Sequence, residues 1–243
     1  MKIIKVKDYQ EMSIAGAKII KEEILKKPNL TICFATGSTP IGMYQALTKM
    51  YQHKELDFSK VTSFNLDEYV GLGQSNPCSY HYFMYKNLFN HININKNNVH
   101  LPNGIGDIAK NASDYEKLIA SKGGIDFMIL GLGTNGHIAF NEPGSKIDES
   151  TREIKLTQST IDANKIYFDN ENDIPKTAIS MGVGSIMKAK KIILLANGIK
   201  KADAIHNMIE GPVTSNCPAS FLQKHHDVTV IIDTEAASKL KNS

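Results

Sequence analysis

A repeated alternation of short apolar runs with longer amphipathic segments constrains the fold of this chain more than any other feature. The apolar runs are typically followed by a glycine or a hydroxyl residue, and then by apolar residues at helical spacing. Strands are predicted at residues 2–6, 30–35, 61–66, 125–130, 191–196 and 228–232, and helices at residues 8–26, 40–51, 77–90 and 200–209. Because continuous apolar strands alternate with helices, we predict an α/β fold, with a Rossmann-like, mainly parallel sheet and helices on both faces. In such a sheet, functional side chains gather at the carboxyl ends of the strands.

The length of 243 residues is compatible with one large α/β domain or two small ones, and no repeat divides the sequence. We predict a single domain over residues 1–243. The polar stretch 151–177 has no clear strand signal. It is either a plain excursion or part of a lid over the site, at about residues 146–177.

The balance of charges excludes several classes of protein. Lys+Arg 28 against Asp+Glu 25 gives a net charge of only +3, so we expect no nucleic-acid partner and no membrane surface. The longest apolar runs cover about a quarter of the ~20 residues that a membrane-spanning helix needs, and the N-terminus lacks the apolar segment of a signal peptide. The 3 cysteines are odd in number and widely spaced, which predicts reduced thiols and a cytoplasmic location. A small-molecule substrate remains as the partner, and the oligomeric state stays open.

The loop after the second predicted strand contains Thr36, Gly37, Ser38 and Thr39, followed by Pro40. Pro40 is predicted at the first helical position, with Thr39 as the helix cap. Backbone N–H groups and hydroxyls at a helix N-terminus form a phosphate site. Since no Walker-type lysine follows, the pattern favours a phosphorylated small molecule over a nucleoside triphosphate. An ordinary, well-capped turn between strand and helix is the alternative.

Two adjacent carboxylates, Asp67 and Glu68, follow the third predicted strand. They point in different directions whatever the local conformation, so we do not expect an acid–base dyad. One of them more plausibly faces the crevice alone, as a base that abstracts a proton next to a carbonyl. A solvated acidic turn is the alternative.

Segment 129–143 has the highest density of candidate residues. Gly131, Gly133 and Gly136 match the dinucleotide-binding pattern, but Pro143 interrupts the helix that this pattern requires. We therefore reject a dinucleotide site and predict that the glycines let the backbone approach a ligand closely.

His137, Asn141 and Glu142 follow in a turn that we expect to be exposed. Histidine exchanges protons near pH 7, and Glu142 can orient it and stabilise its charged form. Together with Asn135, on a glycine-lined loop at the end of a strand, His137 is predicted to be functional rather than structural.

Three segments resemble signature segments of the glucosamine-6-phosphate deaminase family: 64–72 (FNLDEYVGL), Ser79-Tyr80-His81 and 136–143 (GHIAFNEP). Their order and spacing agree over nearly the whole chain. The resemblance implies an enzyme of amino-sugar catabolism, in the degradation of N-acetylglucosamine. The implied reaction is hydrolytic deamination and aldose–ketose isomerisation of D-glucosamine 6-phosphate to D-fructose 6-phosphate and ammonia. A 6-phosphogluconolactonase or another sugar-phosphate isomerase of the same superfamily is the alternative, and a non-catalytic sugar-phosphate-binding regulator is a rival of another class.

The resemblance also implies roles for single residues. Asp67 is the base that moves a proton between C2 and C1 through an enediol-type intermediate. His137 is the base that opens the pyranose ring, supported by Glu142 and Asn135, and Lys201 matches the family's phosphate lysine. A cyclic sugar has no acidic C–H until its ring opens, so two separate proton-transferring groups are needed. Because both steps are proton transfers, we expect no metal and no organic cofactor.

The chain departs from the family pattern at several positions. Asn135 stands where some members have Asp, and it can accept a hydrogen bond and hold the imidazole tautomer but cannot take a proton. Ile166 stands where members have a phosphate-binding Arg, and the neighbouring Lys165 lacks the bidentate fork of Arg. Of the family's regulatory residues Arg152 is present, but Ile154 replaces a lysine and the C-terminal tail is missing. We therefore expect the short, non-allosteric type, without activation by N-acetylglucosamine 6-phosphate.

Overall fold

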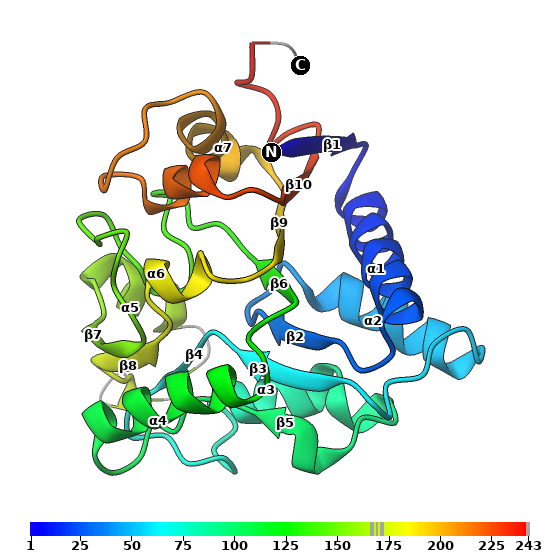
Figure 1. The fold of residues 1–243 in the computed structure, drawn as a ribbon. Helices are drawn as coiled ribbons and strands as arrows, with labels where there is room; N and C mark the ends of the chain where they lie inside the picture. Colours follow the sequence, from blue (N-terminus) through cyan, green and yellow to red (C-terminus); the bar gives the residue numbers. More distant parts are fainter. Residues whose placement is uncertain (166–167, 169, 171–172, 242–243) are drawn as a thin grey trace.

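The computed structural model describes residues 1–165, 168, 170 and 173–241. A seven-stranded sheet in the order β1-β10-β9-β6-β2-β3-β5 forms the centre of the molecule, and its neighbouring strands pair in parallel (Figure 1). Its strands are β1 (Lys2–Val6), β2 (Thr31–Phe34), β3 (Thr62–Asn65), β5 (Val99–His100), β6 (Phe127–Leu130), β9 (Lys191–Ala196) and β10 (Val228–Asp233). The predicted α/β fold is thus confirmed.

Burial along the strands explains why their sequences are mostly apolar. Every residue of β2 and β6 is buried, whereas β1 at the edge has only exposed and partly buried residues. Strands in the middle of a parallel sheet have helices on both faces, so apolar side chains predominate there, with buried Thr31, Ser63 and Asn65 as exceptions.

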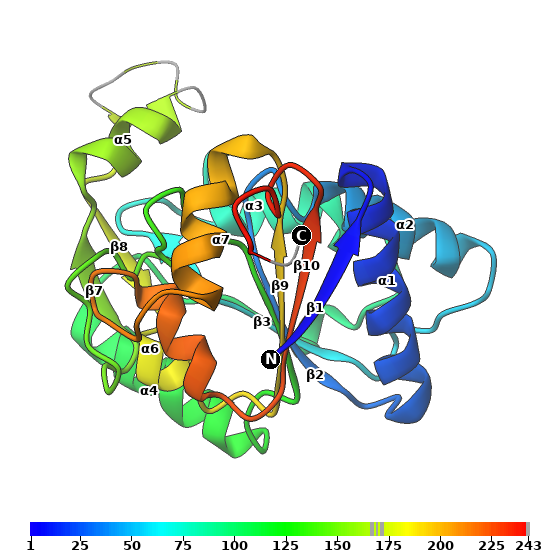
Figure 2. The ribbon, with the colours of Figure 1, turned by 90° about the horizontal axis from the view of Figure 1, so that it is seen from above.

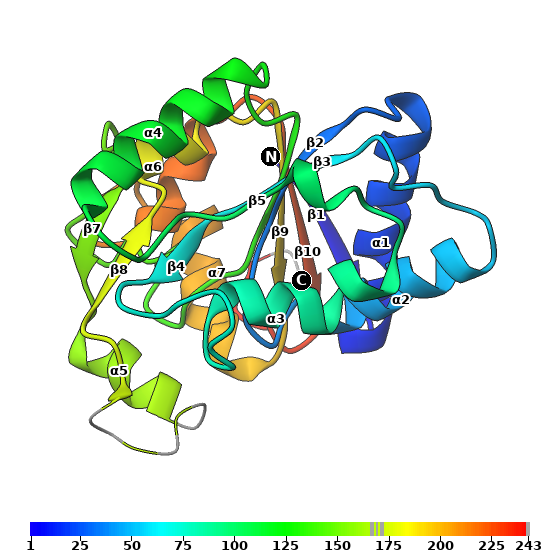
Figure 3. The same cartoon turned by 90° about the horizontal axis from the view of Figure 1, so that it is seen from below.

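Helices cover both faces of the sheet (Figure 2). On one face lie α1 (Tyr9–Lys26) and α2 (Ile41–Gln52), with α3 (Tyr80–Asn87) beside α2 (Figure 3). On the other face lie α4 (Ile108–Ser121), α6 (Val183–Ile186), α7 (Ala202–Ile209) and the 3-10 helix η6 (Pro218–Lys224). Shorter elements are α5 (Gln158–Asn164) and the 3-10 turns η1 (Phe89–His91), η2 (Lys96–Asn98) and η5 (Ile199–Lys201). The helix predicted at residues 77–90 is shorter than expected, because Ser79 caps it through the backbone N–H of Tyr82.

A second, three-stranded sheet of order β4-β8-β7 was not predicted. It consists of β4 (Asp67–Tyr69), β8 (Thr177–Ser180) and β7 (Arg152–Lys155), paired antiparallel. Stretch 151–177, which has no clear strand signal in the sequence, thus contains β7 near its start and the first residue of β8 at its end. β7 alternates partly buried Arg152 and Ile154 with exposed Glu153 and Lys155, and such a short, charged alternation is a weak strand signal.

The order of the strands locates a crevice. From β2 the chain proceeds to β3 and β5 on one side, then returns to β6 on the other side of β2. The loops that follow β2 and β6 diverge at this reversal and leave a space between them, which is where open α/β sheets bind ligands. Within the described part of the chain, no helix is both long and apolar enough to cross a membrane.

Candidate active site

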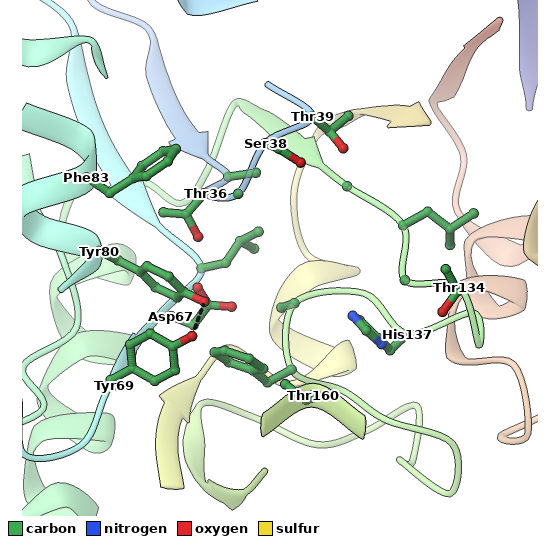
Figure 4. Close-up of a pocket in the computed structure, with 18 of the residues that line it drawn as sticks. Thr36, Ser38, Thr39, Asp67, Tyr69, Tyr80, Phe83, Thr134, His137 and Thr160 are labelled. Carbon is green, nitrogen blue, oxygen red and sulfur yellow. Dashed lines mark hydrogen bonds between the residues drawn. The ribbon is translucent and has the colours of Figure 1, made fainter. Parts of the chain in front are cut away.

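A cavity of ≈ 460 Å³ opens at the carboxyl ends of the strands, at this reversal of strand order. Figure 4 shows Asp67 and His137 on opposite sides of it, with Thr36, Ser38 and Thr39 along a third side. The cavity is lined by eight of the nine predicted site residues: Thr36, Gly37, Ser38, Thr39, Asp67, Asn135, His137 and Lys201. The ninth, Glu142, lies behind Asn135.

The loop from β2 to α2 contributes hydroxyl and backbone groups to the cavity. Gly37 has φ +92°, a conformation that glycine adopts without strain. The predicted cap is wrong in detail: α2 begins at Ile41, Pro40 occupies the cap position, and no side chain caps the helix. Thr39 instead lines the cavity. The N-terminal end of α2 therefore presents backbone donors next to three hydroxyl side chains, an arrangement suited to an anion.

Lys201 reaches the same cavity from η5, which follows β9. Asp233, at the end of β10, accepts the Gly198 N–H with both carboxylate oxygens at 3.0 Å and so anchors the start of this turn. Burial lowers the pKa of Lys201. An anionic ligand would offset that desolvation of the ammonium group.

The carboxyl group of Asp67 is buried, and only 6% of the residue's surface is exposed. Burial, and then the neighbouring charge of Glu68, raise the pKa of Asp67 to about 8. A carboxylate whose pKa lies near the working pH is suited to general-base catalysis.

Glu68 points away from the cavity, as the alternation of side chains along β4 requires. Its carboxylate accepts backbone N–H groups of Tyr69, Tyr80 and His81, each at 2.9 Å. Two of these donors belong to the first turn of α3, so Glu68 joins β4 to the start of that helix. Burial nevertheless raises the pKa of Glu68, although these N–H groups act in the opposite direction.

The side chains of His137, Asn135 and Glu142 are linked by hydrogen bonds into a continuous chain, which we call the relay. The Asn135 amide Nδ2 donates to Glu142 Oε2 at 2.6 Å, which turns its Oδ1 towards the imidazole. Asn135 Oδ1 lies 2.7 Å from His137 Nδ1 and also accepts the His137 backbone N–H at 3.2 Å. Because Oδ1 can only accept, Nδ1 carries the ring proton and Nε2 is left unprotonated in the neutral imidazole.

Hydrogen-bond donors surround the carboxylate of Glu142. Its Oε1 accepts the Thr160 hydroxyl at 2.5 Å and the Thr157 hydroxyl at 3.3 Å, and Oε2 lies 3.5 Å from His137 Nδ1. Burial alone would raise the pKa of Glu142, but the contacts with His137, Thr160 and Asn135 outweigh it and lower the pKa to about 2. The side chain is therefore a fixed anion at neutral pH.

The glycines of this loop make room for protein groups rather than only for a ligand. A Cβ at Gly133 would stand 2.2 Å from the His137 ring, and one at Gly136 would stand 2.6 Å from Cys217 Sγ. Gly131 lines the cavity and has open space around it. The prediction that a glycine lets the backbone approach a ligand therefore applies to Gly131. At Gly133, the missing side chain leaves room for the imidazole of His137 against the backbone.

The expected exposure of the turn is wrong for Asn141, which is completely buried. Its amide donates to the carbonyls of Ile138 and Met181 at 3.0 and 2.8 Å, and its Oδ1 accepts from Arg152 at 3.0 Å. Asn141 thus joins the loop after β6 to the residue that follows β8. A buried amide group requires such hydrogen-bond partners.

Aromatic side chains form a wall of the cavity beside Asp67, which the sequence analysis does not predict. Tyr69, Tyr80, Phe83 and Phe140 line the cavity, and Tyr80 stacks on Phe140 with ring centroids 6.1 Å apart. The Tyr80 hydroxyl donates to the Tyr69 hydroxyl at 3.2 Å. The strand period would have predicted Tyr69, because residues 67 and 69 of one strand share a face. No sequence pattern indicated Thr160.

Two further expectations bear on ligands. In the part of the chain that the structure describes, no cluster of three or more His, Cys, Asp or Glu side chains could hold a metal ion. Ile166, at the position of the family's phosphate-binding arginine, lies outside the described residues.

The chain belongs to the family described as glucosamine-6-phosphate isomerases/6-phosphogluconolactonase, whose sequence profile matches residues 9–231. A relative from Thermoanaerobacter sp. (strain X514), named glucosamine-6-phosphate deaminase, is 55% identical over 239 residues, which cover 98% of this chain and 94% of the relative. One of the same name from Clostridium novyi (strain NT) is 52% identical over 241 residues, which cover 99% of this chain and 100% of the relative. The predicted resemblance is confirmed.

Solved structures divide into near and distant neighbours. A structure of a monomeric glucosamine-6-phosphate deaminase has a TM-score of 0.96 at 40% identity and covers 98% of this chain and 99% of its own. A 6-phosphogluconolactonase from Trypanosoma cruzi has a TM-score of 0.79 at 23% identity, with 99% of this chain and 97% of its own covered. The likeness to the lactonase shows a shared fold.

Proposed function

We propose that this protein is a glucosamine-6-phosphate deaminase, which converts D-glucosamine 6-phosphate and water to D-fructose 6-phosphate and ammonia. The observation that carries the proposal is one cavity lined by an anion-binding loop, a buried carboxyl group of raised pKa and an imidazole relay. The relatives of 52–55% identity carry the same name.

The phosphate of the substrate binds to the loop of Thr36, Gly37, Ser38 and Thr39, at the N-terminal end of α2, with Lys201 as the neutralising cation. Such a remote anchor supplies binding energy that orients a flexible open-chain sugar over the catalytic groups.

His137 opens the pyranose ring. Because Asn135 holds the ring proton on Nδ1, the unprotonated Nε2 can accept the proton of the anomeric hydroxyl and return it to the ring oxygen. Glu142 then stabilises the positive charge that the imidazole acquires on the way.

Asp67 performs the isomerisation. In the open-chain aldehyde, the hydrogen at C2 is acidic because the carbanion that forms is delocalised into the C1 carbonyl. Asp67 removes this proton, and its delivery to C1 converts the resulting enol into an imine at C2. Water adds to the imine, and ammonia leaves with formation of the ketone. Besides the proton transfers, the C1–O bond of the ring breaks when the pyranose opens, and the C2–N bond breaks when the water adduct of the imine releases ammonia.

We also propose a cytoplasmic location and a monomer. Cys33 and Cys217 are buried free thiols, which suits a reducing compartment. The solved deaminase of 40% identity is described as monomeric. The lid at about residues 146–177 stays a proposal. In its favour, Thr160 of α5 contributes to the wall of the cavity.

The test is a coupled assay of ammonia release from glucosamine 6-phosphate, run beside hydrolysis of 6-phosphogluconolactone on the same purified protein. Ammonia release with no lactone hydrolysis above background is expected. Lactone hydrolysis without ammonia release would contradict the proposal.

A further inference from the structure

The two oxygens of the Glu142 carboxylate have separate partners. Oε2 faces the Asn135 amide at 2.6 Å, on the side of the imidazole. Oε1 accepts from Thr160 at 2.5 Å and from Thr157 at 3.3 Å, both from the α5 segment. Thr160 is 9% exposed and lines the cavity, and its hydroxyl contacts the relay through Glu142.

We propose that Thr160 is a positioning residue that sets the tautomer of His137, acting through Glu142 and Asn135. The inference deepens the proposed function, on which its kinetic part rests. A carboxylate can turn about its last bond, and a hydroxyl pinned to Oε1 prevents that turn. Oε2 then stays opposite the Asn135 amide.

The orientation of the Asn135 amide decides which imidazole nitrogen carries the proton. With Nδ2 held by Glu142, Oδ1 faces His137 and requires a proton on Nδ1. If the amide turned over, its NH₂ group would face the ring and would favour an unprotonated Nδ1 with the proton on Nε2. Nε2–H cannot accept the proton of the anomeric hydroxyl. The hydroxyl of Thr160 thus keeps the catalytic nitrogen in its basic form.

Thr157 completes the arrangement from the start of α5. Its single hydroxyl proton is shared between the Thr160 hydroxyl at 3.0 Å and Glu142 Oε1 at 3.3 Å, while its oxygen accepts the Thr160 backbone N–H at 3.3 Å as the helix cap. With a donor behind it, the Thr160 hydroxyl directs its own single proton at Glu142. The relay therefore has its full set of hydrogen bonds only when α5 is folded and lies beside Glu142.

The test compares Thr160→Val, which keeps the shape and removes the hydroxyl, with Thr160→Ser, which keeps the hydroxyl. Thr48→Val on α2, a residue that does not line the cavity, is the matched control. Thr160→Val is expected to lower kcat for glucosamine 6-phosphate by roughly 10-fold or more, as loss of a hydrogen bond to a charged group predicts. Thr160→Ser should recover most of that loss. The inhibition constant of an open-chain amino-alditol phosphate should stay within about two-fold in all variants, because that ligand needs no ring opening.

A spectroscopic readout tests the inference without any substrate. Nitrogen-15 shifts of the His137 ring in the neutral state are expected to show Nδ1–H in the wild type, in Thr160→Ser and in the Thr48→Val control, and a mixture of tautomers in Thr160→Val. An unchanged tautomer in folded Thr160→Val would overturn the inference. If that variant does not fold, Thr157→Val replaces it, with the same direction of change expected and the same unchanged tautomer counting against it. A wild type that releases no ammonia would refute the proposed function alone, since the tautomer measurement does not depend on turnover.

Discussion

Two carboxyl groups near the cavity, Asp67 and Glu142, have opposite surroundings. Asp67 lies in the second sheet beside an aromatic wall, and burial together with the charge of Glu68 raises its pKa to about 8. Glu142 is also partly buried, but hydrogen-bond donors and His137 surround it and lower its pKa to about 2. The same type of functional group is thus prepared for proton exchange at one place and for permanent charge at the other.

In the proposed mechanism, the contrast between the two carboxyl groups separates the two proton transfers. A base that must take a proton from carbon needs a pKa near the working pH, whereas a group that stabilises an imidazolium must never be protonated. The first four of the following predictions remove one side of this contrast, or the charge that maintains it, and the fifth concerns an effector.

The largest effect is expected for Asp67→Asn. The amide keeps the size of the side chain but has no basicity, so kcat should fall by at least about 10²-fold with little change in KM. In heavy water, product of the wild type should contain deuterium at C1 unless the transfer is fully internal. A variant that retains more than a tenth of the wild-type kcat would remove Asp67 from this role.

Glu142→Gln should have the next largest effect. It removes the fixed negative charge behind Asn135 and places an NH₂ group where an acceptor is needed, so kcat should fall roughly 10- to 100-fold. Binding of an open-chain amino-alditol phosphate should be unaffected. Glu153→Gln, on the exposed side of β7, is the control that should behave like the wild type. Equal losses in turnover and in binding of the open-chain ligand would show that Glu142 acts on the whole site and not on ring opening.

The stability of the protein should report the cost of the buried Asp67. Its folded pKa is raised above the unfolded value, so between about pH 4 and pH 8 the folded state holds a proton that the unfolded state has released, and the free energy of unfolding falls as the pH rises. Asp67→Asn removes this loss, and we expect it to be more stable than the wild type by about 1–3 kcal/mol at pH 9 and by little at pH 4. Urea unfolding at the two pH values measures the difference, with exposed Asp148→Asn as the control. A gain that is equal at both pH values would contradict the raised pKa.

Glu68→Gln should shift the pH dependence of the reaction. Removing the neighbouring negative charge lowers the pKa of Asp67, so the acid limb of kcat/KM should move to lower pH by about half a unit to one unit. Comparison with the wild type on the same substrate cancels the ionisations of the substrate itself. An acid limb at the unchanged pH would mean that Asp67 does not control it.

The smallest effect is expected from N-acetylglucosamine 6-phosphate. Arg152 already pairs with Glu149 at 2.6 Å and with Asn141 at 3.0 Å, and Ile154 packs against the cluster that contains Tyr69 and Phe140. An effector can shift an equilibrium only through differential contacts, and little cationic surface is left here to provide them. Rate curves should be hyperbolic with and without the millimolar compound. A sigmoidal curve that becomes hyperbolic on its addition would point to a second site built from other residues.

The apolar strands were predictable because they are buried on both faces, and each predicted strand is present with its ends shifted by a few residues at most. The second sheet could not be predicted because β4 and β7 are short and contain charged residues. These two strands are defined by their pairing with β8 and not by a run of apolar residues. The residues that line the cavity could be predicted where they follow a strand, as Asp67 and His137 do. Thr160 could not, because it meets Glu142 through a hydrogen bond between segments with no pattern in common.

Carbon-13 titration of the Asp and Glu carboxyl groups, assigned by Asp67→Asn and Glu142→Gln, tests the contrast directly. Asp67 is expected to titrate near pH 8, and Glu142 to remain ionised down to the acid limit of the folded protein. An Asp67 carboxyl that titrates near pH 4, as an exposed aspartate does, would contradict the division of roles between the two groups.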